Sequence, residues 1–140
     1  MKYLQPLRLA TYLLLFFAFA HTKGGLFTHT DPGVLAEAVW QGMQNIHYDF
    51  MGQQRTYYDS WIGFGLTATL LLLVVAALAW GLAALDKSVR RQVNFVLWVL
   101  CLGMLANAVL AFKYFFPFPG ILSVAVALLF AFQAWKDRSA

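Results

Sequence analysis

The amino-acid sequence predicts an all-α integral membrane four-helix bundle, with an extracytoplasmic amphipathic helix between membrane helices 1 and 2. Hydrophobic residues make up 61% of the 140 residues and charged residues 11%, whereas soluble domains average roughly 45–50% and about 25%. Four long apolar runs are separated by short polar turns and by one long polar segment. We therefore expect a single membrane domain, 1–140, with an external segment at 22–60 and spans at about 4–21, 61–85, 93–112 and 120–135.

The first apolar run, Leu9 to Ala20, is short for a span of about 20 residues, but it is long enough if Arg8 extends to the lipid head groups. The basic start and the residues Ala18 to Ala20 also match a signal peptide with an A-x-A cleavage site. We favour a retained helix, because phenylalanines are bulky near that site. The glycines of Lys23 to Gly25 are predicted to end the helix.

The polar segment contains a second periodic pattern. Asp31-Pro32 is typical of a helix start. Apolar residues then recur at steps of three and four, which predicts an amphipathic helix from Asp31 to about Met51; they are Leu35, Val39, Met43 and Ile46. An isolated helix of this length is marginal in water, so we expect it to lie on the membrane surface or on the end of the bundle.

The second span, Trp61 to Leu85, begins with Gly63 and Gly65, and these small residues allow another helix to approach closely. These two glycines therefore predict a tight packing site at the start of this span. A short charged turn, Asp86 to Gln92, follows the span.

The third span contains Asn107, a strongly polar residue expected to form a hydrogen bond between helices, and Cys101. Because Cys101 is the only cysteine, an intramolecular disulfide is excluded, and we expect an inert thiol in the core. Phe115 to Gly120 is predicted to form an aromatic turn before the fourth span.

Basic residues indicate the orientation. Seven of the ten lysines and arginines fall on one side of the predicted spans: Lys2, Arg8, Lys87, Arg90, Arg91, Lys136 and Arg138. The other three are Lys23, Arg55 and Lys113. Positive charge is enriched on cytoplasmic loops, so both termini are predicted to be cytoplasmic in a multi-pass protein.

Three motifs carry a family resemblance: His21-Thr22-x-Gly24-Gly25, then Arg55-Thr56-Tyr57-Tyr58-Asp59, then Gly63-Phe64-Gly65. In this combination the chain resembles a family of small bacterial four-helix integral membrane proteins of unknown function. The resemblance covers nearly the whole chain. It implies a bacterial inner (plasma) membrane location and no particular activity.

The same motifs provide the candidate ligand-binding residues: His21, Arg55, Tyr57, Tyr58 and Asp59. Ionisable groups at a membrane boundary are costly unless they are paired or hydrated. Arg55 and Asp59 are four residues apart, so on a continuous helix they share a face and can pair. His21 is expected in the same outer cavity. In the alternative interpretation, Asp59 or Ser60 caps the second span, and Arg55 binds a lipid phosphate or neutralises Asp59.

Other site chemistries find little support. His47 and Asp49 are two residues apart on the predicted helix, on different faces, so we expect no metal site there. The sequence lacks H-E-x-x-H spacing, paired cysteines and a phosphate-binding glycine loop. The basic residues flank apolar runs, so we expect no nucleic-acid partner. We predict no cofactor.

Three functions fit these residues. The first is binding of a lipid, a quinone or another hydrophobic small molecule in an outward-facing polar and aromatic pocket. The second is an accessory structural subunit of a larger membrane complex, with a membrane protein or a second copy of the chain as partner. The third is an enzyme that acts on a membrane-dissolved substrate. Membrane lipids are expected partners in each case.

Overall fold

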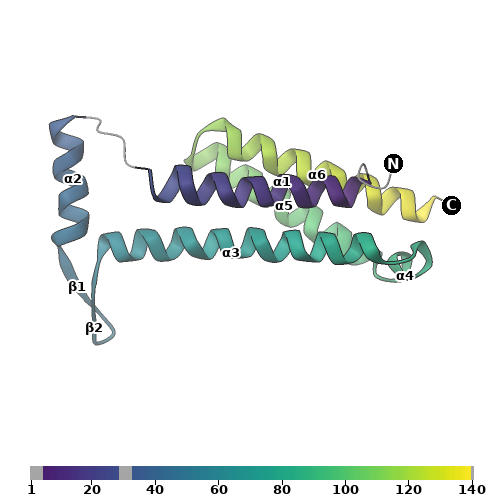
Figure 1. Ribbon diagram of the computed structural model, residues 1–140, viewed down its shortest axis with the longest axis horizontal. Helices are drawn as coiled ribbons and strands as arrows, with labels where there is room; N and C mark the ends of the chain where they lie inside the picture. Colours follow the sequence, from purple (N-terminus) through teal and green to yellow (C-terminus); the bar gives the residue numbers. More distant parts are fainter. Residues whose placement is uncertain (1–4, 29–32, 140) are drawn as a thin grey trace. The chain divides into compact units, whose positions relative to one another are not determined.

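The structure of the protein is a computed structural model, which describes residues 5–28 and 33–139 and is mostly helical. In order, its elements are α1 (Pro6–Ala20), the π-helix η2 (His21–Leu26), α2 (Val34–Asn45), β1 (His47–Phe50), β2 (Gln53–Thr56), α3 (Tyr57–Ala84), α4 (Lys87–Gln92), α5 (Asn94–Tyr114) and α6 (Pro117–Arg138) (Figure 1).

Four helical segments are long and apolar enough to cross a membrane: Pro6–Leu26, Tyr57–Ala84, Asn94–Tyr114 and Pro117–Arg138. The prediction of four such helices is therefore confirmed. Three local predictions were wrong. The charged turn after the second span forms the short helix α4, and α6 already begins at Pro117, because proline fits the first turn of a helix. Lys23 to Gly25 continue as η2, and neither glycine there has a positive φ.

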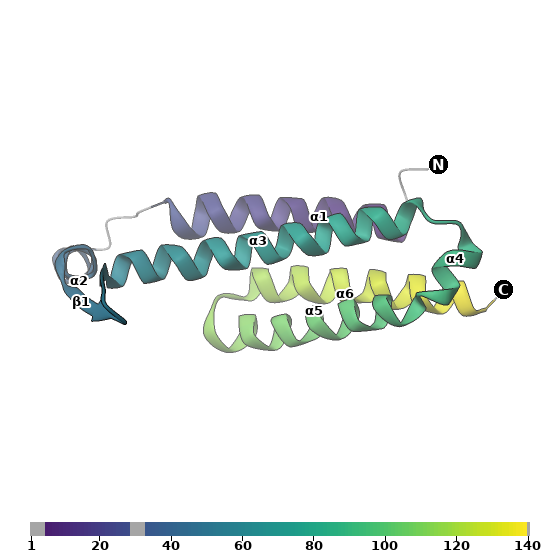
Figure 2. The ribbon, with the colours of Figure 1, turned by 90° about the horizontal axis from the view of Figure 1, so that it is seen from below.

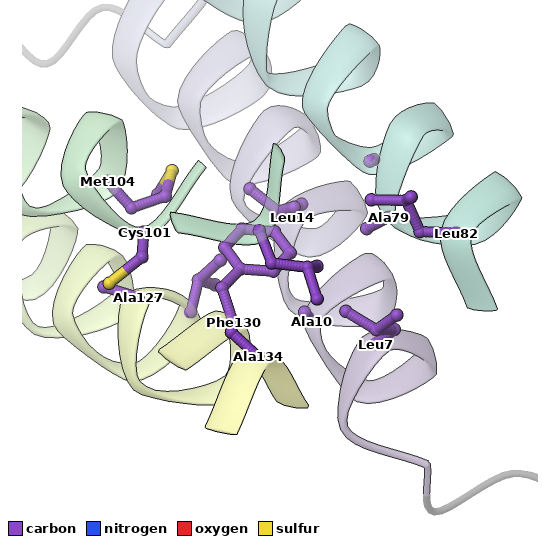
Figure 3. Close-up of a cluster of buried hydrophobic side chains, with 13 residues drawn as sticks. Leu7, Ala10, Leu14, Ala79, Leu82, Cys101, Met104, Ala127, Phe130 and Ala134 are labelled. Atoms are coloured by element: carbon purple, nitrogen blue, oxygen red, sulfur yellow. The ribbon is translucent and has the colours of Figure 1, made fainter. Parts of the chain in front are cut away.

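The chain forms two compact units, one built from residues up to Phe17 and from Leu72 onward, the other from Ala18 to Leu71. The first unit has a hydrophobic core to which α1, α3, α5 and α6 all contribute (Figure 3). Phe130 is fully buried there, with Leu14 and Leu97. Cys101 is a free, buried thiol, as predicted.

Helices α5 and α6 form an antiparallel pair that lies side by side along its length (Figure 2). Only Phe115 and Phe116 connect them, which is shorter than the predicted turn. The Asn107 amide donates to the Ser123 hydroxyl at 2.8 Å, so the predicted hydrogen bond between helices is confirmed. This bond satisfies polar groups on two otherwise apolar helices.

A polar network closes one end of the same unit. The Arg90 guanidinium donates from Nε and Nη2 to the two Asp137 carboxylate oxygens, at 2.6 and 2.9 Å. Gln133 donates to the same carboxylate at 3.0 Å, and Arg90 Nη1 donates to the Leu85 carbonyl at 2.8 Å. Asp137 is only 1% exposed. The network fixes α4 against the last turns of α6.

The second unit differs most from the predicted structure. The predicted helix to Met51 was wrong at its end: α2 stops at Asn45 and residues 47–56 form a β-hairpin. The positive φ of Met51 (55°) and Gly52 (83°) is that of a two-residue type I′ turn. Apolar and polar residues alternate from Ile46 to Phe50, and such alternation is typical of a strand. The predicted helix start at Asp31-Pro32 lies outside the described residues.

Candidate functional site

The hairpin is attached to the start of α3 by side-chain hydrogen bonds. The Thr56 N–H donates to Asp59 Oδ2 at 2.8 Å, and the Asp59 N–H donates to the Thr56 hydroxyl at 3.0 Å. This reciprocal pair is a capping box, which satisfies N–H groups left unpaired at a helix start. The Tyr48 hydroxyl also shares a hydrogen bond with the Ser60 hydroxyl. Together these bonds hold the hairpin in a defined position on α3.

Arg55 has a different partner from the one that its spacing predicts. Its Nη1 donates to the backbone carbonyl of Gln54 at 2.8 Å, while the Asp59 carboxylate accepts from the backbone at Thr56. Arg55 lies on β2 and Asp59 in the first turn of α3, so the two are not on one continuous helix. The guanidinium has five N–H groups. In the described part of the chain, one of them donates to protein, and the side chain is exposed.

One face of the hairpin carries a row of aromatic rings beside this arginine. Tyr48 pairs with Arg55 and Phe50 with Gln53, and directly opposed residues project to the same face. The Tyr48 ring centroid lies 6.5 Å from that of Phe50 and 5.0 Å from that of Tyr57. Phe50 is 60% exposed and Tyr57 53%. We call Tyr48, Phe50, Arg55 and Tyr57 the hairpin face.

Tyr58 contacts α2. Its ring packs edge-on against Trp40, with centroids 5.3 Å apart. The two successive tyrosines therefore make different contacts, since Tyr57 extends the hairpin face whereas Tyr58 packs α3 against α2.

His21 lies at the start of η2 and contacts α3 beyond the hairpin. Its Nε2 and the Gly65 carbonyl are 3.1 Å apart, and because a carbonyl only accepts, Nε2 must carry the proton. The Thr69 hydroxyl donates to the same carbonyl at 3.2 Å, and it lies 2.8 Å from the Thr22 hydroxyl. These side chains thus form hydrogen bonds with one another and with a backbone carbonyl of α3.

Gly65 makes this contact possible. Leu26 is buried, and a Cβ at position 65 would lie 2.8 Å from Leu26 Cδ1 and 2.9 Å from Cγ. By contrast, a Cβ at Gly63 would meet nothing within 4 Å. The predicted close approach at the start of the second span is therefore confirmed at Gly65 alone.

The five predicted site residues thus belong to two sets of contacts. Four of them lie in the hairpin or at its junction with α3: Arg55, Tyr57, Tyr58 and Asp59. His21 bonds to Gly65, six residues after Asp59, or about 9 Å along the helix axis. Among these described residues, no hydrogen bond, ion pair or aromatic contact joins His21 to the other four.

The positions of His47 and Asp49 also differ from the prediction. Both lie on β1, where residues two apart share a face, so the prediction of different faces was wrong. Asp49 Oδ1 accepts from the Gly52 N–H at 3.0 Å. Within residues 5–28 and 33–139, no three His, Cys, Asp or Glu side chains lie close enough to hold a metal ion.

The chain matches no protein-family model, no curated protein and no solved structure. The family resemblance inferred from the three motifs therefore stays a prediction, and arguments about function depend on the residues themselves.

Two residues of this site were not predicted from the sequence, although each belongs to a recognisable sequence pattern. Tyr48 belongs to the alternating pattern before Met51-Gly52, and glycine as the second residue of a two-residue turn indicates a hairpin. Thr56 begins a T-x-x-D pattern that resembles the capping-box signature. The pairing of Thr22 with Thr69 had no such local signal.

Proposed function

We propose that the chain is a multi-pass protein of the bacterial inner membrane, with both termini in the cytoplasm, and that its hairpin face binds a hydrophobic molecule with a polar head. A lipid and a quinone are the ligand classes that fit. The hairpin face is the observation that carries this proposal, because it combines exposed aromatic rings with an arginine whose N–H groups are largely available.

The chemistry of the hairpin face suits such a ligand. Aromatic side chains with one polar end favour the boundary between lipid and water. A guanidinium presents several N–H donors in a plane and binds phosphate or carbonyl oxygen with defined geometry. Arg55 stands opposite Tyr48 on adjacent strands, so a polar head at Arg55 leaves an apolar tail free to lie along the rings.

The surroundings of the hairpin face support a membrane-surface position. In this unit α2 has no buried residue. Six large apolar side chains of α2 and the hairpin region are 56–90% exposed; they are Val34, Leu35, Val39, Ile46, Phe50 and Met51. Exposed apolar side chains in this number mark an interaction surface, and a segment of this kind can lie in the head-group region.

Mass spectrometry of the protein purified with its native lipids tests the proposal. We expect one lipid or quinone to be retained per chain, and to be lost from Arg55→Gln and from Tyr57→Leu. Gln54→Ala is the matched control, because Gln54 neighbours Arg55 on β2 and projects to the opposite face. Equal retention by all three variants and by the unchanged protein would exclude the hairpin face as the binding site.

Orientation has a separate test. A cysteine at the exposed position Gln54, in a Cys101→Ala background, is expected to react with a membrane-impermeant thiol reagent in intact spheroplasts. Reaction only after lysis would place the hairpin in the cytoplasm and refute this part of the proposal.

A second candidate function is that of an accessory subunit, and α3 favours it. Among the 28 residues of α3 only Ala76, Ala79 and Leu82 are buried, which leaves a long apolar surface for a partner helix or for lipid. A protein that co-purifies in a fixed ratio and is lost on substitution of α3, but not of Arg55, would support this function over ligand binding.

A further inference from the structure

A cavity of about 490 Å³ lies in the first unit, at the end closed by the Arg90–Asp137 network. The start of α1, the end of α3, α4 and the end of α6 all line it. Its size is within the range of small-molecule sites. Its lining includes the apolar residues Pro6, Leu7 and Ala83.

The charged residues of the cavity are unevenly paired. Three cations line it, Lys87, Arg90 and Lys136, against two acids, Asp86 and Asp137. Arg90 and Asp137 form an ion pair with each other. In the described part of the chain, neither lysine forms an ion pair. The cavity therefore has two unpaired ammonium groups against one carboxylate.

The Arg90–Asp137 pair is also part of the cavity wall, and several hydrogen bonds hold it in place. Arg90 donates three hydrogen bonds, two to the buried Asp137 carboxylate and one to the Leu85 carbonyl. Two of its five N–H groups remain for another acceptor. Gln133 holds the carboxylate from α6. A guanidinium fixed in this way loses little conformational entropy when it binds an anion.

We propose that this cavity binds a phosphate-bearing anion through Lys87 and Lys136, with Arg90 as a positioned third donor. The apolar residues in the lining suit the first carbons of an attached chain. A phospholipid head group and a water-soluble phosphate ester share this chemistry. The site is separate from the hairpin face and does not depend on the function proposed for it.

Binding of dioleoyl phosphatidylglycerol to the detergent-purified full chain, followed by native mass spectrometry, tests this inference. Loss of one lysine–phosphate interaction weakens binding about fivefold, so Lys87→Gln and Lys136→Gln are each expected to weaken it about fivefold, and the double variant about 25-fold. Asp86→Asn removes the unpaired carboxylate, and we expect it to strengthen binding. Because this effect has the opposite sign, it decides the question even if the double variant fails to fold.

Two controls remove the same charge elsewhere. Arg91 lies on α4 but does not line the cavity, and Lys113 lies at the end of α5. Arg91→Gln and Lys113→Gln should each change the affinity less than twofold. Competition by inorganic phosphate at millimolar concentration would identify a soluble phosphate compound as the ligand, and its failure to compete would identify the lipid. The proposal is overturned if the lysine variants bind like the unchanged protein, if Lys113→Gln has an equal effect, or if dioleoyl phosphatidylcholine binds equally well.

Discussion

Replacement of Gly65 by alanine tests the contact between η2 and α3. The added methyl group would lie 2.8 and 2.9 Å from Cδ1 and Cγ of Leu26, and closer still to Cδ2. Because Cγ is branched and the side chain is buried, rotation of the leucine end does not remove the clash. Overpacking of this kind costs about 1–3 kcal/mol. Alanine in place of glycine inside a helix returns roughly 0.8–1.0 kcal/mol, so we expect a net loss of about 0–2 kcal/mol.

The matched control is Gly63→Ala, in the same helix with open space around the new methyl group. It keeps the helix-propensity gain without the clash, so the two variants are expected to differ by about 1–3 kcal/mol in free energy of unfolding. Unfolding of the purified protein by SDS, followed by tryptophan fluorescence, measures this difference. In the Gly65→Ala background, Leu26→Ala should be less destabilising than in the unchanged protein. Equal stability of the two glycine variants, or strictly additive effects with Leu26→Ala, would refute the reasoning.

Two further predictions concern the hydrogen-bonded ends of helices. Thr56→Ala removes the hydroxyl that accepts from Asp59, and it should lower the free energy of unfolding by about 0.5–2 kcal/mol, whereas Thr56→Ser should retain most of it; equal losses in a thermal melt would contradict the capping box. Arg90→Met leaves the buried Asp137 carboxylate without its ion pair and should cost about 3–5 kcal/mol. Arg91→Met, an exposed neighbour, should change the stability by less than about 0.5 kcal/mol; a similar loss in both would show that the pair is not responsible.

The sequence was informative where one physical signal dominated. Long apolar runs predicted four helices, and the structure has them within a few residues of the predicted bounds. Asn107, a strongly polar residue in an apolar run, predicted its bond to another helix. The hairpin was missed because Ile46 and Phe50 fit a helical step of four as well as a strand step of two. In a short segment of this kind the turn residues, here Met51 and Gly52, determine whether a helix or a hairpin forms.

The candidate site was less predictable, since its contacts depend on where a helix begins. The spacing of Arg55 and Asp59 predicts a pair only if one helix contains both. Thr56 lies between them, immediately before α3, and its backbone N–H donates to the Asp59 carboxylate in place of Arg55. Likewise, Asp137 is within the charged end of the sequence, and no local pattern connects it with Arg90, 47 residues earlier.

The π-helix η2 changes the helical phase of the chain by one residue. In an α-helix continued from the buried Ala18, residue 25 would lie within about 20° of the buried side, and residue 26 about 80° away. Residue 25 is a glycine with no side chain to bury, and residue 26 is the leucine that contacts Gly65. The wider π turn thus accommodates one extra residue and brings that leucine inward. A homologous chain with a plain α-helix here should be one residue shorter between His21 and Leu26, with its apolar residue at the position that Gly25 occupies.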